Sequence, residues 1–350
     1  MCTFTQFAHD LVPNIHIRLL NSISYRYRDE RVNKSAMKRI ICMITLLCVI
    51  SSTACVNQTQ TTGTTKTTAE TTIESTTETT TEQTTEETTT EEKPEVESVQ
   101  ETVSEAKYDY GVFLSVEKNI NRLKDYKTVV IDAQHFKKEE IEAFKAKGHK
   151  VYSYINIGSL EDFRSYYKEY KDLKLGKYEH WEEEIWINVA DQRWQDFITK
   201  NMIPSLIDKD IDGFFVDNCD VYYNYKRKDI MDGLTVMMKA MIATGKAVLI
   251  NGGDCYLDAY CKSGGKWNDV ITGINQETVF SKIIWNKNKF GRAGKEDHKY
   301  FISYVERYAK KGADIYLLEY TKDKKLIAEI KAYCKDKGFG YYVSDSVELD

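Results

Sequence analysis

The chain has 350 residues, of which 42% are hydrophobic and 29% are charged, with a formal net charge of −5. The charge is unevenly spread, because residues 1–55 carry a net charge of +4, residues 56–107 carry −9, and residues 108–350 are neutral overall. The last region therefore lacks the basic surplus that nucleic-acid binding requires, and we expect a partner that is uncharged or charged only locally.

Residues 37–54 have the pattern of an export signal. A basic start at Met37 precedes the apolar run 40–50, which is short for a bilayer span, and small residues then lead to Cys55. Small residues before a cysteine resemble a bacterial lipobox, which implies that Cys55 is lipidated and anchors the exported protein on the extracellular face of the cell membrane. The alternative is an ordinary signal peptide with an incidental cysteine. If the signal is used, residues 1–36 are a mis-assigned N-terminal extension and translation starts at Met37.

Residues 55–107 are a Thr/Glu-rich tract with almost no apolar side chains. Ordering such a tract costs conformational entropy that no apolar burial offsets. We therefore predict a disordered linker, extended by repulsion among its glutamates, which holds the following domain away from the cell envelope.

Residues 108–350 have the pattern of a single (β/α)8 TIM barrel. Short β-rich runs recur eight times, at 110–116, 128–132, 150–158, 212–217, 247–251, 270–277, 314–320 and 338–344. Amphipathic stretches between them predict helices at 138–147, 194–208, 229–243 and 299–311. Alternating strands and helices are typical of a parallel sheet, and eight such units favour a closed barrel over an open sheet. Pro204 is expected to break or bend the second helix.

The region carries no clear cofactor or metal motif. No GxGxxG follows the first strand, so the main dinucleotide-binding signal is missing. The cysteines of this region form no CxxC pair and the histidines are scattered, which gives little support for a zinc site. We predict neither a cofactor nor a metal. The sequence leaves open whether Cys255 and Cys261 form a disulfide or remain free thiols.

Two carboxylates end predicted strands, Asp217 in GFFVD and Glu277 in GINQE. In a barrel the C-terminal ends of all strands meet at one face, where active sites lie. Cleavage of a glycosidic bond needs one carboxyl group to protonate the leaving oxygen and a second to act as nucleophile or base. Asp217 and Glu277 are therefore the predicted catalytic pair, although an Asp in this position also caps helices and a loop Glu is often only solvated.

Other polar and aromatic residues near the strand ends are predicted to bind the sugar, because hydroxyl groups need polar partners and the apolar face of a sugar ring stacks on flat rings. Trp181 and Tyr222 are expected in the groove, whereas Trp186 and Trp194 either line it or pack the connection after the third strand onto the barrel. Asp220 is a sugar ligand, a helix cap or part of a calcium site. The remaining predicted strand-end residues are Asp132, Asn156, Asn251, Gln276, Glu319 and Tyr320.

Four segments occur in a fixed order: VYSYINIGSLEDFR, then W-x-x-x-x-W-I-N-V-A-D-x-x-W, then DIDGFFVDNCDVYY, then GINQE. This series resembles glycoside hydrolase family 114, the endo-α-1,4-polygalactosaminidase-like barrels, across most of residues 108–350. The resemblance implies a (β/α)8 fold and hydrolysis of α-1,4-linked galactosamine-type polymers, with Asp217 as nucleophile and Glu277 as acid/base. It also directs attention to Asp132, Tyr154 and Asp220 as parts of the groove.

One residue departs from the family pattern. Ser159 stands where the family usually has a glutamate directly after the glycine of the third-strand motif, whereas Glu161 and Arg164 keep the rest of the pattern. The missing carboxylate bears on the substrate, because carboxylates around the mouth would favour a cationic sugar.

The sequence thus predicts a monomeric, surface-anchored glycosidase that acts on a polysaccharide. The alternative is a non-catalytic glycan-binding or adhesion lipoprotein that keeps the barrel, motivated by the linker and by Ser159. A remoter alternative is a metal-dependent hydrolase using Asp217 and Asp220. The separation of the two carboxyl groups decides whether the anomeric configuration is retained or inverted.

Overall fold

The computed structural model describes residues 106–350. The predicted N-terminal extension, the signal peptide, Cys55 and nearly all of the Thr/Glu linker lie outside the described residues. Within residues 106–350, no helix is both long enough and apolar enough to cross a lipid bilayer.

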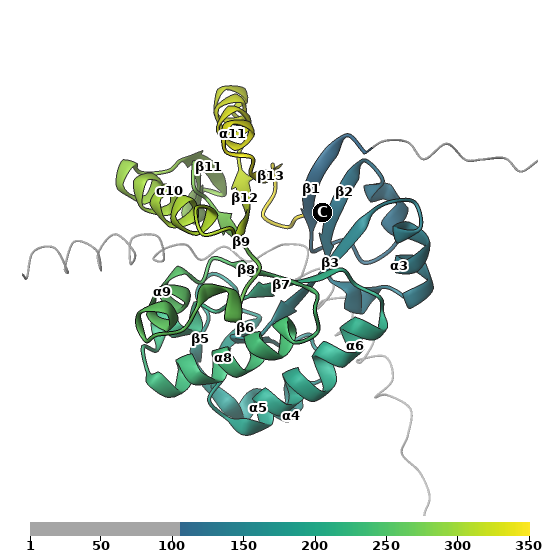
Figure 1. Ribbon diagram of the computed structural model, residues 1–350, viewed down its shortest axis with the longest axis vertical. Coiled ribbons are helices and arrows are strands. Elements are labelled where there is room, and N and C mark those ends of the chain that lie inside the picture. Colours follow the sequence, from purple (N-terminus) through teal and green to yellow (C-terminus); the bar gives the residue numbers. More distant parts are fainter. Residues whose placement is uncertain (1–105) are drawn as a thin grey trace, which may run out of the picture. The chain divides into compact units, whose positions relative to one another are not determined.

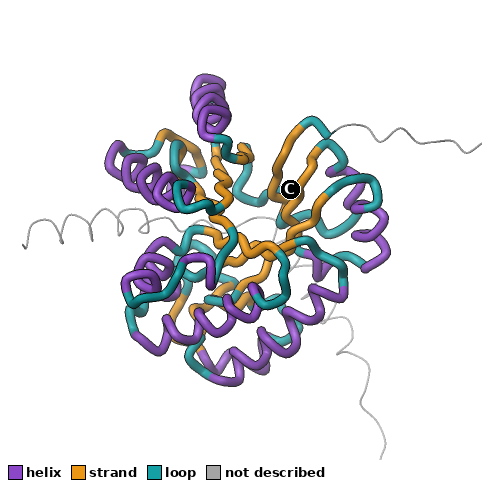
Figure 2. Tube along the Cα trace, in the orientation of Figure 1, coloured by secondary structure: helices purple, strands orange, loops and turns teal. Residues whose placement is uncertain are grey.

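Eight parallel strands form one sheet that curls into a nearly closed barrel, with helices around its outside (Figures 1 and 2). Every strand pairs with its neighbours in the order of the chain, as in a (β/α)8 barrel. The barrel strands are β1 (Tyr108–Phe113), β2 (Tyr126–Ile131), β3 (Lys150–Asn156), β7 (Gly213–Asp217), β8 (Ala247–Asn251), β9 (Gly273–Glu277), β12 (Asp314–Tyr320) and β13 (Gly340–Ser344).

The barrel closes between its first and last strands through side chains and the C-terminal segment. The rings of Phe113 on β1 and Tyr342 on β13 lie 5.1 Å apart between centroids. Just beyond β1, the backbone N–H of Ser115 donates to the Leu349 carbonyl over 3.3 Å. The seam is thus held by aromatic packing and the chain end rather than by a ladder of strand hydrogen bonds.

Helices connect the strands and cover the outside of the barrel (Figure 2). The connections of the first part of the chain contain the 3-10 turns η1 (Ile120–Leu123), η2 (Ala133–His135) and η3 (Lys171–Leu173), and the helices α3 (Lys138–Lys145), α4 (Tyr167–Tyr170), α5 (Gln192–Phe197) and α6 (Ile203–Asp208). The later connections contain α7 (Val221–Asn224), α8 (Lys228–Ile242), α9 (Asp254–Lys262), η5 (Trp267–Asp269), η6 (Trp285–Lys287), α10 (Lys295–Ala309) and α11 (Lys324–Lys337). Cys255 and Cys261 both lie on α9 as free thiols, so they do not form the disulfide that the sequence left open.

The predicted helix 194–208 continues without a break but changes its winding. A π-helical turn, η4 (Ile198–Met202), joins α5 to α6, and Pro204 occupies the first turn of α6. Proline has no N–H to donate to the preceding turn, and π-helical geometry occurs mostly as a single wider turn inserted in an α-helix, as it does here. The expected bend at Pro204 therefore takes the form of a wider turn just before it.

Apolar side chains of alternate strand positions form two separate clusters, one inside the barrel and one between the strands and the helices. Tyr154, Phe215, Leu249 and Leu318 belong to the interior cluster. Since successive side chains of a strand point to opposite faces, a residue two positions after one of these also faces the interior. This alternation decides which strand-end residues reach the mouth of the barrel.

Two excursions leave the barrel at its C-terminal face. After β3, a three-stranded antiparallel sheet combines β4 (Ser159–Glu161), β5 (Lys174–Lys177) and β6 (Glu184–Ile187). After β9, a hairpin is formed by β10 (Ser281–Ile284) and β11 (Lys289–Arg292). The sequence pattern predicts neither excursion, and both carry side chains that face the mouth or lie beside it.

Candidate active site

Asp217 and Glu277 are brought together at the mouth of the barrel by the side chain of Asn251, which ends the strand between theirs. The Nδ2 atom of Asn251 donates to Asp217 Oδ1 over 3.0 Å and to Glu277 Oε1 over 2.8 Å. Two oxygens bonded to one nitrogen cannot be farther apart than the sum of these distances, which is about 6 Å. The two carboxylates are therefore close enough to act on a single bond.

The amide of Asn251 is itself held by a line of hydrogen bonds across the barrel. Asn275 Nδ2 donates to Asn251 Oδ1 over 2.7 Å, and the hydroxyl of Tyr110 on β1 donates to Asn275 Oδ1 over 3.1 Å. Because Asn251 accepts through its oxygen, its nitrogen must point at the carboxylates. Tyr320 adds a second donor to Glu277, with its hydroxyl 2.9 Å from Oε2.

The surroundings raise the pKa of both carboxyl groups. Burial raises the pKa of Asp217, and the nearby charge of Glu277 raises it further, to about 7, against the opposing hydrogen bonds from Asn251 and the Asn218 backbone. Burial also raises the pKa of Glu277, while the bonds from Asn251 and Tyr320 lower it. Both shifts favour a protonated carboxyl group in the pair at a higher pH than free side chains would allow, which suits a site that needs one acid and one base.

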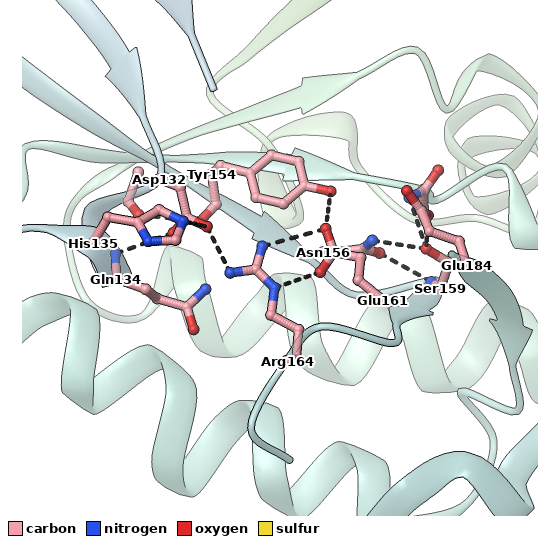
Figure 3. A network of polar contacts seen from close by, with 11 residues as sticks. Asp132, Gln134, His135, Tyr154, Asn156, Ser159, Glu161, Arg164 and Glu184 are labelled. Carbon is pink, nitrogen blue, oxygen red and sulfur yellow. Dashed lines mark hydrogen bonds and ion pairs between the residues drawn. The ribbon is translucent and has the colours of Figure 1, made fainter. Parts of the chain in front are cut away.

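A second polar network lies beside the pair and is centred on Arg164 (Figure 3). Its guanidinium donates to Glu161 through Nε at 2.6 Å and Nη2 at 3.2 Å, and to Asp132 Oδ2 through Nη1 at 2.6 Å. The hydroxyl of Tyr154 donates to Glu161 Oε1 over 3.1 Å. All four side chains are largely buried, and the two carboxylates compensate the charge of Arg164.

Ser159 and Glu184 form the far end of the network in Figure 3. The hydroxyl of Ser159 donates to Glu184 Oε2 over 2.5 Å and accepts from Asn156 Nδ2 over 2.7 Å and from Asn218 Nδ2 over 3.0 Å. Glu184 reaches this point from β6, which pairs with β4 so that Ser159 faces Trp186 and Glu161 faces Glu184. A carboxylate thus occupies the region next to Ser159, although Ser159 itself supplies none.

Gly158 allows the segments after β3 and β7 to approach each other closely. A Cβ atom at Gly158 would lie 1.7 Å from the backbone oxygen of Asn218, far inside van der Waals contact. Asn218 has a left-handed φ of 65°, which turns its side chain toward Ser159. The glycine is therefore required by the contact that assembles this side of the mouth.

Two of the predicted groove residues lie on the other face of their strands. Gln276 is buried between Asn275 and Glu277, its Nε2 donates to the Glu277 carbonyl, and its Oε1 has no protein partner. Glu319 is fully buried and accepts from the backbone N–H groups of Phe280 and Ser281 over 2.9 and 2.8 Å. Glu319 thereby fixes the start of the β10–β11 hairpin, and the structure does not bring either residue to the carboxylate pair.

The tryptophans divide into two groups. Trp194 and Trp186 are buried, and the indole N–H of Trp194 donates to the Ile157 carbonyl, so both pack the connection after β3 onto the barrel. Trp181 is only half-buried and meets Trp285 of the β10–β11 hairpin edge to face, with ring centroids 5.9 Å apart. The two excursions from the barrel therefore touch through aromatic rings.

The other two predicted groove residues follow β7. Asp220 precedes α7 without capping it through its side chain, and its charge acts on Cys255 and Tyr304, which places it toward α9. Tyr222 is partly buried and packs against the outer apolar cluster.

Several residues of the site were not among the predicted site residues. Asn275 and Tyr110 were detectable in principle, since alternation along GINQE and YDYGVF places them on the interior face. Glu184 follows two other glutamates and carries no sequence signal of its own. Trp285 belongs to a hairpin that the sequence did not reveal.

Comparison with known proteins identifies the family. A model described as glycoside-hydrolase family GH114 matches residues 85–349, about three quarters of the chain and from a point inside the predicted linker. No curated protein gives a significant match. Among solved structures, the chain is similar to the glycoside hydrolase domain of PelA from Pseudomonas aeruginosa, with 15% identity and a TM-score of 0.58 over 69% of this chain and 96% of that one.

The chain is also similar to Aspergillus fumigatus Ega3 in its complex with galactosamine, with 16% identity and a TM-score of 0.56 over 70% of this chain and 93% of that one. At such identities the structural likeness shows the fold, and the family model shows the family. The chain therefore belongs to glycoside-hydrolase family GH114 and is a glycoside hydrolase.

Proposed function

We propose that this chain hydrolyses α-1,4-linked galactosamine-type polysaccharide by a two-carboxylate mechanism that retains the anomeric configuration. The observation that carries the proposal is the single amide of Asn251, which bonds both Asp217 and Glu277 and limits the separation of the bonded oxygens to about 6 Å. Retaining glycosidases have carboxyl groups about 5–5.5 Å apart, whereas inverting ones need about 6.5–9.5 Å to admit a water molecule. The galactosamine bound in the Ega3 structure supports the substrate class.

In the proposed reaction Asp217 attacks the anomeric carbon while Glu277 gives its proton to the leaving oxygen, so that the glycosidic bond breaks and a glycosyl-aspartate forms. Glu277 then takes a proton from water, whose oxygen attacks the same carbon and releases Asp217. The assignment of the two roles follows the family resemblance. Binding of a cationic sugar next to Asp217 would favour its ionised form and leave the shared proton on Glu277.

The test is digestion of a partially deacetylated galactosamine polymer, followed by measurement of reducing ends. We expect Asp217→Asn and Glu277→Gln each to reduce turnover by at least 10³-fold. Asp232→Asn and Glu142→Gln make the same chemical changes on exposed helix surfaces and should leave turnover unchanged. Turnover that persists in the Asp217→Asn, Glu277→Gln double variant would contradict the proposal.

Azide separates the two roles when the substrate carries an activated leaving group. With Glu277→Ala, azide should replace water in the second step and give a glycosyl azide of retained configuration. With Asp217→Ala, azide should attack directly and give the inverted product. The reverse pattern would exchange the roles of the two carboxylates.

We also propose that the enzyme is an exported lipoprotein held at the outer face of the cell membrane by a lipid on Cys55. The proposal rests on the sequence pattern of residues 37–54 and on the Thr/Glu composition of residues 55–107. Labelling of growing cells with a fatty-acid probe should mark the wild-type protein and not Cys55→Ser, which should instead appear in the medium or remain unprocessed. Equal labelling of both proteins would rule out Cys55 as the lipidated residue.

A further inference from the structure

Glu184 is a carboxylate at the mouth of the barrel that lacks a basic partner. Within residues 106–350, Arg164 forms ion pairs with Glu161 and Asp132, whereas no Lys, Arg or His side chain does so with Glu184. Glu184 nevertheless lies directly opposite Glu161 in the β4–β6 pairing. When Glu184 is ionised, no basic side chain of residues 106–350 compensates its charge.

Ser159 fixes the position of Glu184 and is not itself available to a ligand. A hydroxyl group has one proton to donate and two lone pairs to accept with, and Ser159 uses all three, toward Glu184, Asn156 and Asn218. Ser159 is 1% exposed, whereas Glu184 keeps partial exposure to solvent. The two asparagine donors oblige the serine proton to point at the carboxylate.

The electrostatic surroundings of Glu184 favour a cation. Burial raises the pKa of Glu184 to about 8, and the charges of Glu161 and Asp217 contribute to the rise, while the bond from Ser159 opposes it. An entering cation would remove this repulsion and form a short charge-assisted hydrogen bond of about 2.7–2.9 Å with the carboxylate. Ser159 also accepts a hydrogen bond from Asn218, the residue directly after Asp217, which places this cation site beside the attacking carboxylate.

We propose that Glu184, positioned by Ser159, binds the protonated amino group of a deacetylated sugar next to the bond that is cleaved. The inference rests on the proposed glycosidase function and adds a specificity-determining residue to it. A primary ammonium offers three donors and a full charge, whereas an acetylated nitrogen offers one N–H and no charge, so Glu184 distinguishes the two forms of the sugar. No group of three or more His, Cys, Asp or Glu side chains within residues 106–350 is arranged to hold a metal ion, which favours an organic cation here.

Calorimetric titration of the full chain with galactosamine and with N-acetylgalactosamine tests this inference. Glu184→Gln should weaken galactosamine binding at least 10-fold and leave N-acetylgalactosamine binding unchanged. Glu183→Gln is the matched control, because it removes the same charge from the adjacent, exposed position. Equal loss for both sugars in Glu184→Gln, or the same loss in Glu183→Gln, would overturn the proposal.

A double-mutant cycle tests the positioning role of Ser159. Ser159→Ala should weaken galactosamine binding in the same direction as Glu184→Gln, and the double variant should bind no more weakly than Glu184→Gln alone, because the serine acts through the carboxylate. Additive losses would show that Ser159 acts independently of Glu184 and would refute its positioning role. Calorimetry measures binding separately from turnover. A wild-type protein that hydrolyses no polymer but still binds galactosamine in preference to N-acetylgalactosamine would therefore refute the proposed hydrolysis and not the role of Glu184.

Discussion

Replacing Asn251 by alanine tests the arrangement of the carboxylate pair most directly. The change removes one hydrogen bond of 3.0 Å to Asp217 and one of 2.8 Å to Glu277. A hydrogen bond to a charged group contributes about 1.5–3 kcal/mol, and 1.36 kcal/mol corresponds to one pKa unit, so each carboxyl pKa should rise by about 1–2 units. The pKa of Asp217, already raised to about 7, should then lie well above neutral.

The assay is the pH dependence of kcat/KM on an amino-sugar polymer. The active form of the pair carries one proton, so activity falls when both groups are ionised at high pH and when both are protonated at low pH. In the wild type we expect the high-pH limb near the Asp217 pKa of about 7 and the low-pH limb above 4.5, since the Glu277 pKa is raised from that value. Asn251→Ala should move both limbs upward by about 1–2 units and reduce the maximum on the order of 10²-fold, because the carboxylates are no longer held in place.

The control is Asn121→Ala, which removes an exposed asparagine far from the mouth and should leave the profile unchanged. A profile for Asn251→Ala whose limbs coincide with those of the wild type would refute the reasoning, even if the rate were lower. In that case the amide would matter for folding or binding and not for the ionisation of the pair.

Three further substitutions probe separate features of the fold and the site. Tyr320→Phe removes the 2.9 Å hydrogen bond to Glu277, so steady-state kinetics should show kcat reduced about 10-fold or more with KM little changed. A change confined to KM would contradict a role of Tyr320 in catalysis. Gly158→Ala places a Cβ atom 1.7 Å from the Asn218 carbonyl oxygen, so the melting temperature should fall by at least about 4 °C. An unchanged melting temperature would show that the segments after β3 and β7 can separate freely. Burial raises the pKa of Glu319 to about 7 from 4.5, so the stability due to its protonated form is complete below about pH 4.5 and is lost as the pH rises through 7. In urea unfolding, the wild type should therefore lose about 3 kcal/mol more of its unfolding free energy than Glu319→Gln between pH 4.5 and 8. The same dependence of unfolding free energy on pH in both proteins would contradict this prediction.

The strands of the barrel were predictable because each is a short β-rich run followed by polar residues and a helix. The predicted strands 247–251 and 314–320 coincide with β8 and β12, and the other six overlap their observed strands with shifted ends. The two excursions were not predicted, since β4, β5, β6, β10 and β11 are short strands stabilised by contacts with one another rather than by a strong local pattern.

The catalytic pair was predictable because its two residues end strands on the interior face. The same alternation, applied residue by residue, would have separated Glu277 from Gln276 and Tyr320 from Glu319, and would have added Asn275. The position of Glu184 beside Ser159 could not be predicted, because these two residues are 25 positions apart in the chain and meet only through the antiparallel register of β4 and β6. A carboxylate does therefore lie beside Ser159, but it is supplied by β6.

The line of hydrogen bonds from Tyr110 to Asn251 has a consequence for when the enzyme becomes active. Tyr110 lies on β1, at one end of the strand order, whereas Asn275 and Asn251 lie on β9 and β8, so the line is complete only when the first strand has joined the later part of the barrel. A chain that has folded β7, β8 and β9 can already carry Asp217 and Glu277 on either side of Asn251, yet the side-chain oxygen of Asn275 lacks its hydrogen bond from Tyr110 until β1 has docked. Molecules in which β1 is not docked should therefore hold Asn251 less firmly and be less active, so activity depends on the first strand as well as on the strands that carry the carboxylates.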